Sequence, residues 1–137
     1  MTDLPPLPSD YLAFLETHDG KRSYTFNELD SYWMTTREGL MQTVNFSGRK
    51  RPAIFLPRSI VESLREQGDG NALADQDGEE FKLDRLASCL AIGDNNGDPV
   101  FLDPSDNFSV WLYYHDGFDV ERLADSFGEW LSEAEFD

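Results

Sequence analysis

Cysteine, histidine and basic residues are scarce in this chain, and each scarcity removes a class of function. The single cysteine excludes an internal disulfide and a metal site built from thiolates. The two histidines are too far apart in the sequence to form the paired motif of a zinc site. Lysine and arginine together number 11 against 27 acidic residues, which gives a net charge of −16. Nucleic acid and anionic membranes would be repelled by such a chain.

Long apolar runs are absent as well. No run approaches the roughly 20 residues that span a bilayer, and the acidic start of the chain lacks the apolar segment of a signal peptide. We therefore expect a soluble, cytoplasmic protein. Its 137 residues are 39% hydrophobic and 13% aromatic, which is enough for a packed core. This length predicts one domain, residues 1–137.

The acidic residues are unevenly distributed along the chain. Residues 1–67 contain 9 acids and 8 bases, whereas residues 68–137 contain 18 acids and 3 bases. The second half thus has a balance of −15, and its field would attract a basic partner and accelerate its association. The alternative is that the charge serves solubility alone, since net charge informs on association and not on fold.

A run of apolar segments and turn formers between Leu90 and Tyr114 predicts the most regular part of the fold. Leu90–Ile92, Pro99–Leu102 and Phe108–Tyr114 have strand composition, and Gly93–Asp98 is rich in turn-forming residues. Strands this close together predict an antiparallel meander.

Elsewhere the pattern predicts elements with unequal clarity. Ser9 or Asp10 can cap a helix whose residues Tyr11, Phe14 and Leu15 share a buried face. The remaining expectations are an edge strand at Arg22–Phe26, a basic turn at Ser47–Pro52, a strand at Ala53–Leu56, a helix from Pro57 to Gly68, and a loop or irregular hairpin at Gly68–Glu80. Residues 27–47 fit a helix through Leu29, Trp33, Leu40 and Val44 as well as a strand at Tyr32–Thr36, and Phe81–Cys89 fits either type.

Four short motifs occur in the order typical of one family. They are Leu7-Pro-Ser-Asp-Tyr-Leu-Ala-Phe-Leu running into Asp19-Gly20, the turn Ile92-Gly-Asp-Asn-Asn-Gly-Asp98, the strand end Tyr114-His-Asp116, and Ser126-Phe-Gly-Glu-Trp-Leu131. In this order they resemble the SUKH superfamily, which contains bacterial immunity proteins and a fungal regulator of cell-wall synthesis. The resemblance covers both ends and the last third of the chain.

The resemblance implies a fold and a function. It places a short strand at Val120–Ala124 with Asp125 or Ser126 capping the last helix, whereas the pattern alone also fits a longer helix capped by Asp119. We predict one α+β domain, with a mainly antiparallel sheet that has helices on one face and at its edges. The implied function is immunity: binding a cognate toxin, for example a nuclease, without catalysis. A non-enzymatic regulatory scaffold is the alternative.

Several residues begin a pattern that would support catalysis or metal binding, but none of these patterns is complete. Asp94-x-Asn96-x-Asp98 and Asp75-x-Asp77-x-Glu79 begin like calcium loops, but neither has the glycine and glutamate that such a loop requires later. Cys89 lies among apolar residues and has the surroundings of an inert core thiol. His115 and Asp116 are adjacent on a strand and so point to opposite faces. We predict no catalytic residue, no metal and no cofactor.

The partner is expected to be a toxin protein with a basic surface, and not nucleic acid or membrane. We predict that its contacts are acidic side chains of the second half: Asp75, Asp77, Glu79, Glu80, Asp94 and Asp98. Trp111 and Tyr113 face one side of their predicted strand, and Val110, Leu112 and Tyr114 face the other. Either one of these sets is exposed and anchors the partner, or both faces of the strand are covered.

Overall fold

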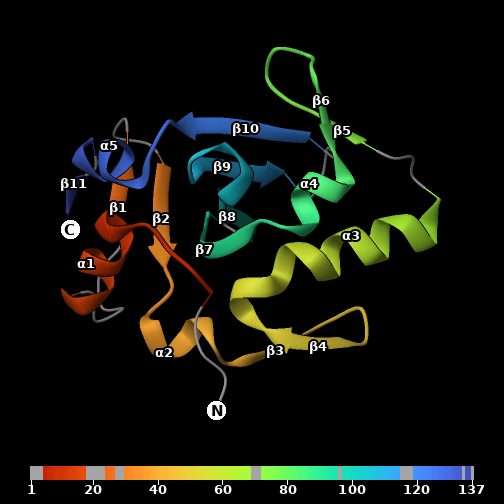
Figure 1. Cartoon of the computed structure of the whole chain (residues 1–137), viewed down its shortest axis with the longest axis horizontal. Helices are drawn as coiled ribbons and strands as arrows, with labels where there is room; N and C mark the ends of the chain where they lie inside the picture. Colours follow the sequence, from red (N-terminus) through yellow and green to blue (C-terminus); the bar gives the residue numbers. More distant parts are fainter. Residues whose placement is uncertain are drawn as a thin grey trace.

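The meander predicted from the sequence forms the centre of the sheet in the computed structural model (Figure 1). The structure describes residues 5–17, 24–26, 30–68, 72–95, 97–114, 119–133 and 135–136. The central strands are β7 (Leu90–Asn95), β8 (Asp98–Asp103) and β9 (Ser109–Tyr114), and they pair antiparallel in chain order. The strands at the Gly93–Asp98 turn are longer than predicted, since pairing continues to Asn95↔Asp98.

Within the described residues, nine strands form one sheet in the order β11-β1-β2-β7-β8-β9-β10-β5-β6. The outer strands are β1 (Tyr24–Phe26), β2 (Asp30–Met34), β5 (Ala72–Ala74), β6 (Glu80–Lys82), β10 (Asp119–Ala124) and β11 (Glu135–Phe136). Neighbouring strands run antiparallel except β10 and β5, which are parallel. The predicted mainly antiparallel α+β fold is therefore confirmed.

Helices pack on both faces of this sheet, which is more cover than the one face that the sequence predicted. The helices are α1 (Ser9–Thr17), α2 (Arg37–Leu40), α3 (Leu56–Gln67), α4 (Leu83–Ala87) and α5 (Phe127–Ser132), with short 3₁₀ turns η1 (Ala53–Phe55) and η2 (Pro104–Asp106). Side chains of α1 and α5 pack against Val100 and Leu102 of β8. Those of α3 and α4 pack against Phe101, which points to the opposite face.

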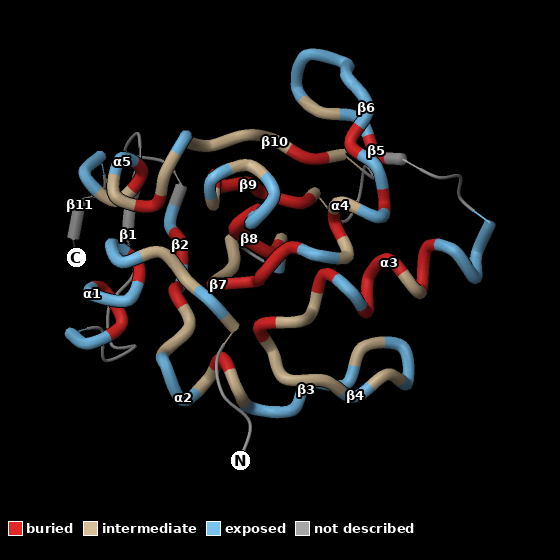
Figure 2. The backbone as a smooth tube through the Cα atoms, in the orientation of Figure 1, coloured by how far each residue is buried: buried red, intermediate tan, exposed pale blue. Residues whose placement is uncertain are grey.

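Two buried clusters result, one on each face of the sheet, and both include residues of the central strands. Figure 2 shows buried stretches along β7, β8 and β9. On β9, Val110 and Leu112 belong to one cluster, and Trp111 and Tyr113 belong to the other. The hypothesis that one face of this strand is exposed is therefore wrong. Both faces are covered because α1 and α5 pack on one of them and α3 and α4 pack on the other.

The N-terminal and C-terminal helices are as predicted. Tyr11, Phe14, Phe127 and Trp130 are buried, and Leu131 is partly buried against the same cluster. The Phe14 and Phe127 rings meet edge to face with centroids 5.1 Å apart. At the start of α5, the Ser126 side chain accepts the Glu129 N–H, so the strand at β10 followed by a Ser126 cap is the alternative that holds.

The region before α3 differs from its prediction. Arg49–Pro52 is a strand, β4, that pairs with β3 (Thr43–Phe46), so the basic residues do not form a turn. The turn itself is Ser47-Gly48, where both residues have positive φ of 52° and 84°. Ala53–Leu56 is likewise not a strand, since η1 leads directly into α3.

The β3–β4 hairpin lies alongside α3 (Figure 1), and ion pairs explain why basic residues occupy a strand there. Arg51 donates to both carboxylate oxygens of Glu62, and Arg49 pairs with Glu62 and Glu66. Gly68 ends α3 in the left-handed conformation, with φ of 76°, as predicted. None of the helices in the described ranges is long and apolar enough to cross a membrane.

The remaining ambiguous segments resolve into short elements. Asp30–Met34 is a strand and Arg37–Leu40 is a helix, so the ambiguous stretch contains both. The acidic segment before β6 is a hairpin and not an extended loop. Tyr24–Phe26 is a strand but not an edge, because it pairs with both β2 and β11. Gly20, Arg22 and residues 27–29 of these predictions lie outside the described residues.

Candidate functional site

The six acidic residues predicted to bind a partner fall into two separate groups. Asp75, Asp77 and Glu79 lie in the loop between β5 and β6, and Glu80 begins β6. By contrast, Asp94 and Asp98 flank the turn between β7 and β8. Strands β9 and β10 lie between β8 and β5 in the sheet. The fold therefore does not bring all six side chains into one site.

Asp75 builds the β5–β6 loop through its own carboxylate. Its Oδ1 accepts the backbone N–H groups of Asp77 and Glu79, at 2.8 and 2.9 Å. The Asp75 N–H donates to the Glu79 carbonyl at 2.8 Å, and Gly78 has the positive φ that the turn requires. The two carboxylates of Asp77 and Glu79 are thus presented on a loop with an ordered backbone.

Gln76 ties this loop to the neighbouring strand. Its side-chain Oε1 accepts the Arg122 N–H at 3.0 Å, and its Nε2 donates to the Arg122 carbonyl at 3.3 Å. The amide side chain therefore satisfies both the backbone donor and the backbone acceptor of Arg122. This contact joins residues 46 apart in the sequence and extends the β5–β10 pairing beyond Ala74.

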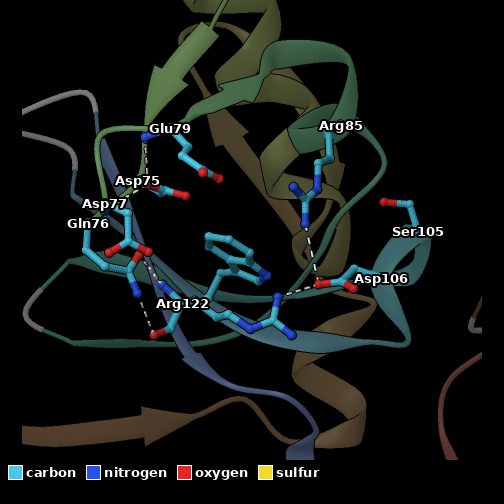
Figure 3. A pocket seen from close by; sticks show the side chains of 9 residues that line it. Asp75, Gln76, Asp77, Glu79, Arg85, Ser105, Asp106 and Arg122 are labelled. Carbon is cyan, nitrogen blue, oxygen red and sulfur yellow. Dashed lines mark hydrogen bonds and ion pairs between the residues drawn. The ribbon is translucent and has the colours of Figure 1, made fainter.

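The loop forms one wall of a pocket with a volume of about 600 Å³ (Figure 3). The residues that line the pocket are Asp75, Gln76, Asp77, Glu79, Arg85, Ser105, Asp106, Trp111 and Arg122. They come from the β5–β6 loop, α4, η2, β9 and β10, so five elements spread over residues 75–122 converge here. Glu80 points elsewhere and lines a smaller depression with Arg65, Lys82 and Asp84.

Two arginines occupy the floor of the pocket, and both are held by carboxylates. Arg85 donates through Nε to Asp103 Oδ2 at 2.5 Å, and its Nη2 lies 3.6 Å from Asp106. Arg122 contacts Asp106 at 2.5 Å and Asp125 at 2.8 Å. The Asp103 carboxylate is fully buried, and Ser105 donates to its other oxygen from both the backbone and the hydroxyl. A buried carboxylate is tolerated here because each oxygen has a donor.

The ring of Trp111 contacts both of these arginines. The guanidinium carbons of Arg85 and Arg122 are 5.1 and 5.6 Å from its ring centroid, within the range of a cation–π contact. Its indole N–H donates to Ser109 Oγ at 2.8 Å, and that hydroxyl donates to Asp106 Oδ2 at 2.9 Å. Only 4% of Trp111 is exposed, so it belongs to the floor of the pocket and is not a projecting anchor.

The second acidic group lies beside an exposed aromatic residue that the sequence reasoning did not single out as a contact. Trp33 of β2 is 52% exposed and stands opposite Asp94 in the β2–β7 pairing. The Asp94 carboxylate accepts the Gly97 N–H at 3.1 Å, so it helps to form the turn. Gly93 lets β2 approach closely, because a Cβ there would lie 2.6 Å from the Trp33 carbonyl oxygen.

Cys89 has the surroundings of a core residue, as the sequence predicts. Cys89 is buried, its Sγ lies 3.3 Å from the Arg85 carbonyl oxygen, and burial raises the pKa of its thiol. Among the residues that the structure describes, no group of three or more acidic, histidine or cysteine side chains is placed to hold a metal ion. His18, His115 and Asp116 lie outside the described residues.

The fold and the pocket define an acidic α+β protein with a charged, preformed depression on one side of its sheet. A comparison with protein-family models matches residues 5–133 to the family described as SMI1 / KNR4 family (SUKH-1). The chain belongs to this family, as the four sequence motifs predicted. Comparisons with curated proteins and with solved structures found no match.

Proposed function

We propose that this protein is an immunity protein that binds a cognate bacterial toxin in the cytoplasm of the producing cell and neutralises it. The observation that carries the proposal is family membership over residues 5–133, because immunity proteins belong to this family. The protein acts by binding alone and uses no catalytic step, metal or cofactor. Its partner is a toxin protein with a basic surface.

The charge of the second half supports this type of partner. The 18 acids of residues 68–137 include Asp75, Asp77 and Glu79, which line the pocket from the β5–β6 loop and form its acidic rim. Many toxins are nucleases, and a nuclease binds the phosphate backbone through basic side chains. An acidic surface competes for those same side chains, so it blocks the substrate without contacting the catalytic residues. Electrostatic attraction also accelerates capture of the toxin.

Co-expression with the gene product encoded next to this protein tests the proposal. We expect cells that produce the neighbouring toxin to survive only when this protein is present. The two purified proteins should also elute as one complex in size-exclusion chromatography. A toxin that kills equally well with and without this protein, and that does not bind it, would contradict the immunity function.

The same family includes a second function, a regulatory scaffold that binds a housekeeping protein, and the family description that names SMI1 and KNR4 supports it. The co-expression experiment separates the two functions. If no neighbouring gene product is toxic or binds, then the scaffold is the function to pursue, by isolating complexes from the native host.

A further inference from the structure

We propose that the pocket beside the β5–β6 loop is a socket for one lysine or arginine side chain that projects from the partner protein. The inference rests on the proposed function, since it takes the partner to be a protein with a basic surface. It adds the contact itself: which part of this surface receives which chemical group.

The pocket does not select an anion, although it contains two arginines. Three carboxylates, those of Asp103, Asp106 and Asp125, already pair with the guanidinium groups of Arg85 and Arg122. An incoming phosphate or carboxylate would have to displace these bonds, and it would meet the acidic rim as it entered. The arginines therefore stabilise the floor and are not free to bind a ligand of opposite charge.

The wall that the β5–β6 loop forms has carboxylates without a basic partner among the described residues. Within the described part of the chain, no basic side chain forms an ion pair with Asp77 or Glu79, and neither carboxylate accepts a hydrogen bond that shapes the loop. The pocket and its immediate surroundings thus contain six carboxylates and two guanidinium groups. The full set of carboxylates is Asp75, Asp77, Glu79, Asp103, Asp106 and Asp125. A group with positive charge is what this excess attracts.

The dimensions and rigidity of the pocket suit a side chain with a charge at its end. Its volume of about 600 Å³ is within the range of small-molecule sites. Lysine and arginine carry their charge at the end of a long flexible side chain, so the charged group can reach the Asp77 and Glu79 carboxylates while the backbone of the partner stays outside the pocket. The Gln76 contacts to Arg122 hold that rim against β10 before any partner binds, which lowers the entropy cost of binding.

Nuclear magnetic resonance with a minimal probe tests the socket without a toxin. The probe is the capped tripeptide acetyl-Gly-Arg-Gly-amide, and its control is the same peptide with citrulline, which is uncharged and nearly isosteric. The chain has three tryptophans, whose indole N–H signals report on three places. Trp111 reports on the pocket, Trp33 on the exposed face of β2, and Trp130 on the core.

Two double variants separate the socket from the general negative field. Asp77→Asn with Glu79→Gln removes the unbalanced rim charges. Glu16→Gln with Glu38→Gln removes the same net charge from exposed positions that do not line the pocket. Both variants should keep the fold, because Asp75 and not the replaced side chains holds the loop backbone. An unchanged Trp130 indole signal, which reports on the core, checks this.

We expect the arginine peptide to shift the Trp111 signal in a saturable way, while the Trp33 signal moves little. Binding should weaken about tenfold in the D77N/E79Q variant and remain within about twofold of wild type in the E16Q/E38Q variant. Equal shifts from the citrulline peptide, shifts confined to Trp33, the same loss in both variants, or no shift of Trp111 would each overturn the socket. Binding of the peptide to a protein that gives no protection against toxin would retain the socket and reject the immunity function.

Discussion

Asp106 is the residue on which the floor of the pocket depends. Its carboxylate accepts hydrogen bonds from Arg122 and from the Ser109 hydroxyl, and it lies near Arg85. The hydrogen bond from Arg122 is the main cause that lowers the pKa of this carboxyl below its usual value of 3.8, while burial acts in the opposite direction. The folded protein thus favours the ionised form.

This lowered pKa predicts a pH-dependent effect of Asp106→Asn. A carboxyl whose folded pKa lies below its unfolded pKa contributes its full stability above about pH 4, and the contribution disappears as the pH falls through the folded value. We expect the variant to lose about 1–2 kcal/mol of unfolding free energy at pH 7, since the side chain is partly exposed. Urea unfolding at pH 7 and pH 3 measures this. The difference from wild type should shrink at pH 3, and an unchanged difference would contradict the assignment.

Tyr11 gives a second prediction at the scale of one residue. Its hydroxyl is buried and has no hydrogen-bond partner within the described residues, and burial raises the pKa of the phenol. A buried hydroxyl without a partner costs free energy, so Tyr11→Phe should be neutral or stabilise the fold by up to about 1 kcal/mol. Thermal and urea melts measure the change. Destabilisation by more than about 1 kcal/mol would mean that the hydroxyl has a hydrogen bond in solution.

At the scale of elements, the packing of α1 against α5 closes one face of the sheet. The two helices come from opposite ends of the chain and lie together in Figure 1. Gly128, near the start of α5, donates its N–H to the Asp10 carboxylate of α1 at 2.8 Å. A Cβ at Gly128 would lie 3.0 Å from that carboxylate, so the close approach favours glycine there. Trp130 packs edge to face on Tyr32 of β2, with centroids 5.3 Å apart.

This packing predicts a large loss of stability for Trp130→Ala. The side chain is buried in the cluster that joins both terminal helices to the sheet, so its removal leaves a cavity that two helices and a strand must line. The expected cost is about 3–5 kcal/mol in urea unfolding, the usual range for a buried aromatic residue. Trp33→Ala is the matched control, because that tryptophan is half exposed, and it should cost much less. Similar losses for both variants would contradict the assigned burial.

The elements that the sequence predicted correctly are those whose cause is local. The Leu90–Tyr114 meander has alternating apolar runs and turn formers, and α1 has an apolar face at helical spacing. By contrast, the sequence pattern predicts a turn where β4 lies, because three basic residues in four indicate exposure to solvent. Their acidic partners, Glu62 and Glu66, lie in a helix that has to pack alongside the hairpin first, and no local pattern contains that information.

The sequence indicates only the acidic part of the candidate site, because its other residues come together through long-range packing. The acidic loop was identifiable from composition, but its division into two groups depends on strand order. Arg85, Arg122 and Trp111 were missed as parts of one pocket. A signal for the arginines did exist: residues 68–137 contain only three bases, and two of them lie in the pocket. In such an acidic half, a basic residue is expected to have specific carboxylate partners.

At the scale of the whole molecule, the charge asymmetry of the sequence becomes an asymmetry of surfaces. Three bases of the first half, Arg49, Arg51 and Arg65, lie on or beside α3, where each pairs with a carboxylate. The acids of the β5–β6 loop lie across the sheet from the terminal helices and are not neutralised in this way. We therefore expect a basic partner to approach that loop and not the α3 side.

This asymmetry predicts how association with the toxin responds to salt and to mutation. The association rate should fall as salt rises, because exposed charges are screened over about 8 Å at physiological ionic strength. Replacing Asp77, Glu79 and Glu80 by their amides should slow association more than it speeds dissociation, since three charges leave the approach surface and Asp75 still shapes the loop. The fold should survive, because solvated carboxylates contribute little to stability.

The measurement is surface-based binding kinetics with the toxin from the neighbouring gene, at two salt concentrations. The matched control replaces Glu16, Glu38 and Glu129, three exposed acids that do not line the pocket. It changes the net charge equally, so it reports the effect of total charge alone. If the loop is the contact surface, then the loop variant slows association more than the control at both salt concentrations. Association that is independent of salt, or equal slowing in both variants, would place the interface on another surface of the molecule.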